Sequence, residues 1–399
     1  MIPRFRPPVD PGVLLSVVQL ARPDAVRRYE SAFADAVGMR HAIAFSYGRT
    51  AIRCFLESHG LASQEVICPA YSCVVVAHAV MASGNQPRFI DSSPDDPNMD
   101  LDAALAAVTA ETGALIPTSL FGRPVDLDRI RAFRNRHPQI PVLQDCCHSF
   151  SIDTEAGSVQ AAGDAAVFAL NFSKVTTSVF GGMLTTDDAD HAQKFRRWRD
   201  RNGRRSGWAK VVRRRAYTLA GVPVFWPGVY GITDRLIRSG MLDRFVSYFD
   251  PATIEMPPDH LEDLTNFEAE VGLRSLSQVD GRIGMRRAAA RIYLEAFGDD
   301  LGIDPGDPSV ATFSHFILRH EDPEGFIREG RRRGVEYGRI VDYSIPDLPS
   351  YRDLGHAVLP NASKHAASMV NVPVAVSERE ARRIAAVTRD VLAVLGTMR

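Results

Sequence analysis

The sequence predicts an α/β fold, in which a large domain built on a doubly wound, mostly parallel sheet precedes a smaller C-terminal α+β domain. Two observations carry this prediction. Between about residues 26 and 190, short apolar runs alternate with stretches of helical periodicity, the order of parallel strands joined by helical crossovers. After residue 250 the chain changes to long, charged helical stretches around a strand-like run, TFSHFILRH. The 399 residues are enough for two domains, or for one large domain with a smaller appendage.

We expect the large domain to span 1–250 and the small domain to span 251–399. The expected strands of the large domain are, in chain order, HAIAF, EVICPA, QPRFID, GALIPTS, PVLQDC, AAVFAL and GGMLTT. The expected helices around them are AVRRYESAFADAVG, RTAIRCFLESHG, VVVAHAVMASG and LDRIRAFRNRH. In doubly wound sheets, ligands bind at the carboxyl ends of the strands. The stretches YGRTA, QDCCH and NFSK are therefore expected to share one site.

The composition indicates a globular enzyme of the cytoplasm. With a net charge of -1 and 45% hydrophobic residues, the chain is neither a disordered acidic protein nor a general nucleic-acid binder. The number and scatter of the cysteines favour neither a disulfide framework nor a zinc site, so we expect reduced thiols and no metal. The apolar run GVLLSVVQLA follows several prolines and lacks a cleavage site, so we expect it in the mature protein. The five cysteines are Cys54, Cys68, Cys73, Cys146 and Cys147.

Residues 194–232, which overlap an insert at about 200–250, stand apart from the rest of the chain. The run KFRRWRDRNGRRSGWAKVVRRR has Asp200 as its only acid, and the seventeen residues AYTLAGVPVFWPGVYGI after it carry no charge. Two prolines make the uncharged part marginal for a membrane-spanning helix. Basic residues beside Trp and Tyr suit a peripheral contact with a membrane surface. A subunit interface or a lid is the more ordinary interpretation, and we favour it over the membrane.

Several polar groups stand at the predicted strand ends. Asp145, in QDCCHSF, is placed where a strand ends, although an Asp there is by itself more often a helix N-cap than a catalytic group. In YGRTAIRCFL, the backbone amides of Gly48 to Thr50 precede a helical run and can face an anion, and Arg49 adds a cation. An ordinary loop entering a helix would explain the same glycine. His148 and the cysteines beside it are equally common as core residues.

The segment ALNFSKVTTSVFGG adds a lysine to these groups. Lys174 is its single charged residue, and a lysine is seldom buried without a partner or a task. A phosphate cradle, a carboxylate at a strand end and a lysine are the three parts that pyridoxal phosphate requires. The lysine forms the Schiff base, the carboxylate keeps the pyridine nitrogen protonated, and amides hold the phosphate. The combination predicts pyridoxal 5'-phosphate as the cofactor.

From about residue 25 to 395 the sequence resembles the DegT/DnrJ/EryC1/StrS aminotransferases, the sugar aminotransferase branch of fold type I. The matching stretches are YGRTAI, EVICPAYSCVVVAHAV, LFGRPVDLDRI, QDCCHSF, NFSK with the GG after it, and LTNFEAEVGLRSL. The resemblance implies pyridoxal phosphate and a homodimer, because fold type I active sites usually form between two subunits.

The resemblance also implies roles for particular residues. Lys174 falls on the Schiff-base lysine, and Asp145 falls on the partner of the pyridine nitrogen. Gly48 and Arg49 fall on the phosphate turn. His148 falls where the family usually has a glutamine against the cofactor, near its ring oxygen. A histidine keeps a hydrogen-bonding group there, with a charge that we expect to depend on pH.

Three positions depart from the family pattern. The phosphate-binding serine five residues before the lysine is Ala169, and the aromatic residue that stacks on the cofactor ring is Cys73. Leu261 stands where the family has an asparagine that reaches into the neighbouring subunit. Compensation at the phosphate is expected from Arg49, Ser173 or Asn171.

By this resemblance we expect an aminotransferase that moves an amino group from glutamate or glutamine to a keto or aldehyde acceptor. The implied acceptor is a ketosugar, often carried on a nucleotide, in the biosynthesis of a polysaccharide, a glycolipid or a natural product. Lys174, once released from the cofactor, would be the acid and base of the proton shift.

Three other functions stay open. Sugar dehydratases of the family replace the Schiff-base lysine with histidine, so Lys174 argues against that activity. An enzyme at the inner face of the membrane, acting on a lipid-linked or amphiphilic acceptor, would explain the apolar and basic insert. A non-catalytic, cofactor-binding regulatory protein would explain the departures at Ala169 and Cys73.

Overall fold

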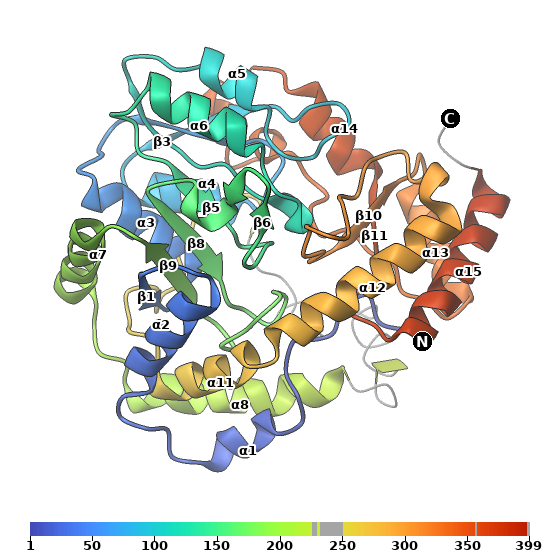
Figure 1. Cartoon of the computed structure of the whole chain (residues 1–399), viewed down its shortest axis with the longest axis horizontal. Helices are drawn as coiled ribbons and strands as arrows, with labels where there is room; N and C mark the ends of the chain where they lie inside the picture. The colour runs from blue at the N-terminus through green and yellow to red at the C-terminus, as the bar shows by residue number, and fades with distance from the viewer. Residues whose placement is uncertain (226–229, 232–249, 356, 397–399) are drawn as a thin grey trace.

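The computed structural model describes residues 1–225, 230–231, 250–355 and 357–396 (Figure 1). A central sheet with helices on both faces fills most of the first half of the chain, and a smaller two-stranded sheet lies among the C-terminal helices. The strands of the central sheet are β1 (His41–Phe45), β2 (Glu65–Pro69), β3 (Gln86–Ile90), β4 (Thr112–Leu115), β5 (Leu143–Asp145), β8 (Ala165–Ala169) and β9 (Gly182–Thr186). Six of the seven fall within the runs that the sequence predicts as strands, and β4 begins one residue before its predicted run, GALIPTS.

The central sheet has the strand order β3-β2-β4-β5-β8-β9-β1. Strands β3, β2 and β4 pair in parallel, as do β5 and β8. The two groups meet where parallel bridges join Leu115 to Val142 and Thr118 to Asp145. Strand β9 is antiparallel to both of its neighbours, β8 and β1. The predicted mostly parallel sheet is confirmed, and β9 is the exception among these seven strands.

Alternate strand residues supply two hydrophobic cores, one on each face of the sheet. In β1, Ile43 and Phe45 belong to the first core, and Ala42 and Ala44 to the second. The helices of the first face are α3 (Gly48–Ser58), α4 (Val75–Ala82), α7 (Ala189–Asn202) and, from the C-terminal half, α14 (Pro360–Ser368). Those of the second face are α2 (Ala25–Ala36), α5 (Leu101–Ala106), α6 (Leu127–Arg136) and α11 (Asn266–Leu276). The predicted doubly wound arrangement is therefore confirmed.

The C-terminal half has a core of its own. Strands β10 (Phe316–Arg319) and β11 (Met369–Val372) pair antiparallel. The helices around them are α12 (Val279–Phe297), α13 (Pro323–Arg332) and α15 (Glu378–Leu395). The strand expected in TFSHFILRH and the helix expected in SEREARRIAAVTRDVLAVL are both present. A separate short hairpin, β6 (Asp153–Thr154) and β7 (Gly157–Ser158), lies between β5 and β8 in the chain.

The first residues of the chain lie against its C-terminal half. Ile2 bridges to Val335 and is buried in the C-terminal core. Two ion pairs follow, from Arg4 to Glu336 and from Arg6 to Glu380. The division of the chain at residue 250 stays a prediction, and these contacts join its two ends.

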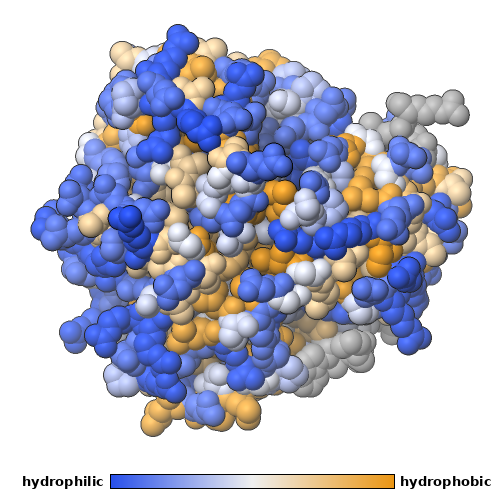
Figure 2. All heavy atoms as spheres, in the orientation of Figure 1, coloured by the Kyte–Doolittle hydropathy of each residue, from blue (hydrophilic) through white to orange (hydrophobic). Residues whose placement is uncertain are grey.

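The predicted insert contains α8 (Trp208–Val224), which packs against the short N-terminal helix α1 (Val13–Val18). Figure 1 shows both helices at the lower edge of the molecule, and Figure 2 shows hydrophobic side chains at that edge. No helix in the described ranges is long and apolar enough to cross a bilayer. Positions 226–229 and 232–249, which include part of AYTLAGVPVFWPGVYGI, lie outside the described residues.

Candidate active site

The carboxylate of Asp145 is buried at the carboxyl end of β5. Its Oδ2 atom accepts a hydrogen bond of 3.1 Å from the Thr118 hydroxyl, and its Oδ1 atom accepts one of 2.9 Å from the Cys147 backbone N–H. No helix begins at Asp145, so the N-cap interpretation does not hold. Two donors fix the carboxylate at the strand end, as the sequence predicts for a group facing the site.

Lys174 stands in the turn that follows β8. The Asn171 side chain shapes this turn, because its Oδ1 atom accepts hydrogen bonds from the Ser173 backbone N–H (3.0 Å) and hydroxyl (2.6 Å). The Lys174 side chain is half-buried, and its amine has no hydrogen-bond or ion-pair partner among the described residues. Lys174 nevertheless acts electrostatically on the side chains next to Asp145. Burial and then Asp145 raise the pKa of the Cys147 thiol, and Lys174 lowers it.

His148 is buried beside Lys174 as a neutral ring. Its Nδ1 atom accepts a hydrogen bond of 3.3 Å from the Phe121 backbone N–H, and the two rings stack with centroids 6.0 Å apart. Burial, followed by the charges of Lys174 and His315, holds the pKa of His148 well below its usual value. The lowered pKa moves the expected pH-dependent charge of this ring to more acidic pH, so near neutral pH the ring is uncharged. With Nδ1 as the acceptor, the proton is on Nε2, which can donate.

A second histidine, His315, comes to the same place from the C-terminal half. It immediately precedes β10, and its ring centroid lies 5.6 Å from that of His148. Burial, followed by the charges of Arg286 and Lys174, lowers the pKa of His315 to about 3. The sequence analysis missed this residue. A lone histidine at the start of a strand carries no signal that relates it to Lys174.

The predicted phosphate turn is the N-terminus of α3. Tyr47 is its N-cap in an extended conformation, and no side chain caps the first turn. Gly48 lies close to β8: a Cβ at Gly48 would stand 3.1 Å from the Cβ of Ala169. A Cβ at Gly182, on β9, would stand 2.4 Å from the Tyr47 carbonyl carbon. The turn thus packs against the strand that leads to Lys174, and uncapped amides there can bind an anion.

Arg49 places a cation at this helix N-terminus. Its Nη1 atom donates to the Glu255 carbonyl at 3.2 Å, and it has no carboxylate partner among the described residues. Burial lowers the pKa of Arg49, with Cys73 and Tyr47 acting in the opposite direction. Half-burying a cation without an acidic partner costs free energy unless an anion completes the site. Arg49 is therefore well placed to balance a phosphate.

The other residues predicted to bind the cofactor already have partners within the protein. Thr50 donates its backbone N–H to the Tyr47 carbonyl (3.1 Å) and its hydroxyl to the His260 carbonyl (3.0 Å), so it has no free donor. Asn171 and Ser173 bond to each other and support the Lys174 turn. Cys73 is half-buried near Arg49, and its thiol interacts with Tyr343.

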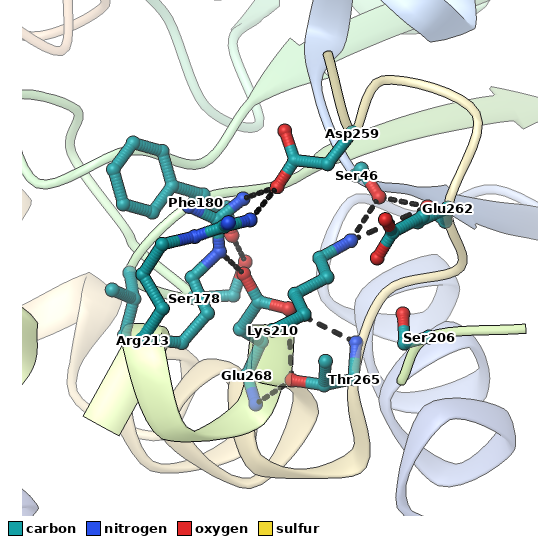
Figure 3. A network of polar contacts seen from close by, with 12 residues as sticks. Ser46, Ser178, Phe180, Ser206, Lys210, Arg213, Asp259, Glu262, Thr265 and Glu268 are labelled. Carbon is teal, nitrogen blue, oxygen red and sulfur yellow. Dashed lines mark hydrogen bonds and ion pairs between the residues drawn. The ribbon is translucent and has the colours of Figure 1, made fainter. Parts of the chain in front are cut away.

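A buried polar network lies behind the phosphate turn (Figure 3). Lys210 of α8 donates to the Ser46 hydroxyl at 2.7 Å and to the Asp263 carbonyl at 2.8 Å. Ser46 in turn donates to the Glu262 carbonyl. The cationic run was expected to face a subunit, a lid or a membrane. This lysine instead points into the protein.

Arg214, one helical turn further along α8, joins the same network. It donates to the Tyr47 hydroxyl at 2.8 Å and pairs with Asp259 and Glu268, each at 2.9 Å. Its guanidinium carbon lies 4.0 Å from the centre of the Phe180 ring. The Tyr47 hydroxyl donates to Asp259 at 2.6 Å.

The assembled groups fit pyridoxal phosphate. An unpaired amine (Lys174), a fixed buried carboxylate (Asp145), a neutral ring donor (His148) and an uncapped helix N-terminus with a cation (Arg49) stand at the carboxyl ends of neighbouring strands. They match the aldehyde, the pyridine nitrogen, the ring oxygen and the phosphate of that cofactor. The described residues contain no cluster of His, Cys, Asp and Glu suited to a metal ion.

This fold and this set of side chains define a fold type I transferase of the sugar aminotransferase kind. The chain belongs to the DegT/DnrJ/EryC1/StrS aminotransferase family, whose model matches residues 15–223.

Curated relatives are aminotransferases and synthases of sugars and cyclitols. The chain is 33% identical to GDP-perosamine synthase of Caulobacter vibrioides over 46% of its own length and 50% of the relative's. It is 32% identical to L-glutamine:2-deoxy-scyllo-inosose aminotransferase of Streptomyces paromomycinus over 82% of its own length and 69% of the relative's. For the first of these, the match spans half of the relative.

Solved structures share the fold. The sugar aminotransferase CalS13 of Micromonospora echinospora superposes with a TM-score of 0.76 at 20% identity, covering 98% of this chain and 100% of that one. DesV of S. venezuelae, solved with a ketimine intermediate, superposes with a TM-score of 0.73 at 20% identity, covering 97% and 94%.

Proposed function

We propose that this protein is a pyridoxal phosphate-dependent aminotransferase acting on a keto group of a sugar or a sugar-like ring. One observation carries the proposal: the half-buried, unpartnered amine of Lys174 lies in one site with the buried carboxylate of Asp145. A lysine amine that no hydrogen bond or ion pair occupies is available to bond a carbonyl carbon. Family membership and the neutral His148 support the same assignment.

Each residue has a distinct task in this proposal. The bound cofactor supplies an electron sink for the carbon that loses its proton. Lys174 Nζ would hold the cofactor aldehyde and, once released, would carry the proton between two carbon atoms. Asp145 would keep a proton on the pyridine nitrogen, and His148 Nε2 would donate a hydrogen bond to the ring oxygen. Arg49 and the first amides of α3 bind the phosphate.

The amino donor in this proposal is glutamine or glutamate, and the acceptor is a ketosugar carried on a nucleotide. Relatives named for L-glutamine and for GDP- or dTDP-linked sugars support both choices. The test is the absorbance spectrum of the purified protein with pyridoxal phosphate, before and after excess L-glutamate or L-glutamine. A visible band that converts to a near-ultraviolet band with one donor supports the proposal. No visible band with the wild-type protein contradicts it.

The active enzyme in this proposal is a homodimer in the cytoplasm. Family membership supports the dimer, although Leu261 stands where the family has an asparagine that reaches into the neighbouring subunit. Light scattering should give twice the chain mass of 43.9 kDa. A monomeric mass for a fully active enzyme would contradict this part of the proposal.

A second candidate places the enzyme at a membrane surface, with a lipid-linked or amphiphilic acceptor. Eight large apolar side chains of the described chain are more than half exposed, and six of them lie on α1, on α8 or just after α1. Helices α1 and α8 contain no Asp or Glu. Arg213 and Arg205, which are close in sequence to these apolar side chains, are exposed. The six are Leu15, Val18, Leu20, Trp208, Val212 and Leu219. Cations around exposed apolar groups suit anionic lipid.

Vesicle co-sedimentation tests this candidate. The protein should bind vesicles that contain phosphatidylglycerol and not pure phosphatidylcholine, and added salt should weaken the binding. Replacing Leu20 and Trp208 by Ser should abolish it, whereas replacing Val358 and Val394, which are also more than half exposed but lie outside the patch, should not. Equal binding by both double variants would contradict the candidate. A change in oligomeric mass without a change in vesicle binding would assign the patch to a subunit interface instead.

A further inference from the structure

The face of α8 that packs against the rest of the protein carries charged side chains, although apolar side chains usually occupy such buried positions. The side chains of Arg214 and Glu268 are 5% and 0% exposed, and Lys210 is also buried. Removing such a charge from water costs roughly several kcal/mol for each ion. An ion pair in the interior often stabilises a protein no more than well-packed apolar side chains of similar size do. Stability alone therefore does not account for them. Buried ion pairs differ from apolar contacts in being directional, which allows them to fix one arrangement.

Glu268 is tied into the network from its own helix. It is the third residue of α11, and its Oε2 atom accepts hydrogen bonds from the Thr265 backbone N–H (3.0 Å) and hydroxyl (2.8 Å) in a capping box. Its Oε1 atom remains for Arg214. The start of α11 and the inner face of α8 are thereby locked to each other (Figure 3).

The network ends on the two residues that precede the phosphate turn. Lys210 holds Ser46, and Arg214 and Asp259 hold the hydroxyl of Tyr47. Tyr47 is the N-cap of α3, and its carbonyl accepts the N–H groups of Thr50 and Ala51. The position of Tyr47 therefore sets the direction of the first free amides of α3. Binding groups must be held within about 0.5 Å of their productive place, which requires such support behind them.

We infer that Arg214 and Lys210 of α8 are positioning residues for the cofactor phosphate, acting through Tyr47 and Ser46 on the N-terminus of α3. The inference rests on the proposed function. It makes α8, which lies in the insert, a support of the phosphate turn, which both cations reach through Ser46 and Tyr47. It also assigns the position of the phosphate turn to contacts made within one chain.

Two ligands separate positioning of the phosphate from general destabilisation. Apoprotein is titrated with pyridoxal phosphate and with pyridoxal, which lacks the phosphate, and the melting temperature of each apoprotein is recorded. Arg214→Met should weaken pyridoxal phosphate binding about tenfold, the range typical of supporting residues, and leave pyridoxal binding unchanged. Arg214→Lys should restore part of the loss. Arg213→Met is the matched control: Arg213 also pairs with Asp259, at 2.7 Å, but its side chain is 60% exposed, so little change is expected.

Tyr47→Phe keeps the test decisive if Arg214→Met does not fold. It removes only the hydroxyl that the network holds, and it should weaken pyridoxal phosphate more than pyridoxal. Equal losses for both ligands, or no loss for either, in a folded Arg214→Met or Tyr47→Phe protein would overturn the inference while leaving the proposed function intact. If the wild-type protein binds pyridoxal but gains nothing from its phosphate, the inference is also overturned. Absence of binding by the wild type to either ligand would instead remove the proposed function.

Discussion

At the scale of single residues, the two charged groups at the centre of the candidate site differ in how firmly the protein fixes them. Two hydrogen bonds hold the Asp145 carboxylate, and the Lys174 amine has no partner among the described residues. A proton-carrying group needs freedom to move, whereas a group that stabilises charge works best when it is fixed in advance. The two residues therefore differ in the way that their proposed tasks require.

Lys174→Ala should abolish both the visible band of the bound cofactor and turnover. The amine is the group that bonds the cofactor and carries the proton, and alanine can do neither. Absorbance and donor conversion are measured on the same sample. Survival of either signal would contradict the role of Lys174.

Asp145→Asn should lower kcat by at least about a hundredfold while the protein still folds. The amide oxygen can still accept from Thr118 or Cys147, but it carries no negative charge to keep the pyridine nitrogen protonated. The measurement is kcat, with circular dichroism as the folding control. Unchanged kcat would show that the carboxylate has a structural task alone.

His148 should make stability depend on pH. Its pKa in the folded protein lies well below the usual value, so the unfolded chain binds the proton more tightly. The stabilising contribution is present above the unfolded pKa of about 6.5 and is lost as pH falls below it. His148→Gln should therefore reduce the slope of the unfolding free energy between about pH 6 and pH 5 by up to about 1.4 kcal/mol per pH unit. Denaturant titrations at these pH values measure it, and an unchanged slope would contradict the buried neutral ring.

At the scale of elements, the close contact of β9 with the phosphate turn predicts an intolerant glycine. A Cβ at Gly182 would meet the backbone of Tyr47 and Gly48 at 2.4 to 2.5 Å, and backbone cannot move aside as a flexible side chain can. Gly182→Ala should cost about 1–3 kcal/mol of unfolding free energy.

A glycine of α12 provides the control for Gly182. Nothing lies within 4 Å of a Cβ at Gly284, so Gly284→Ala should stabilise the protein by about 0.5–1 kcal/mol. Both changes are measured by denaturant unfolding. Equal effects of the two substitutions would contradict the close packing at β9.

At the scale of the whole molecule, the N-terminal residues connect the two ends of the chain. Arg6 donates to both carboxylate oxygens of Glu380, at 3.0 and 2.6 Å, and this hydrogen bonding lowers the pKa of Glu380 to about 2. Because the folded pKa is depressed, the contribution is present above the unfolded pKa and is lost as pH falls towards 2. Arg6→Ala should lower the melting temperature at pH 7, and the difference from wild type should shrink below about pH 4. A constant difference across this range would contradict the ion pair.

The sequence alone determined the seven central strands, four of the helices around them and the meeting of YGRTA, QDCCH and NFSK, because these follow from local periodicity and from the rule that parallel strands end at one edge. Tertiary structure decided which polar residues are internal. Local sequence presents Lys210 and Arg214 as members of an exposed basic run, yet their partners Ser46, Asp259 and Glu268 lie far away in the chain. The same holds for His315, which reaches His148 only after the C-terminal half has packed. A buried charge needs a partner, and only the folded chain brings such distant partners together.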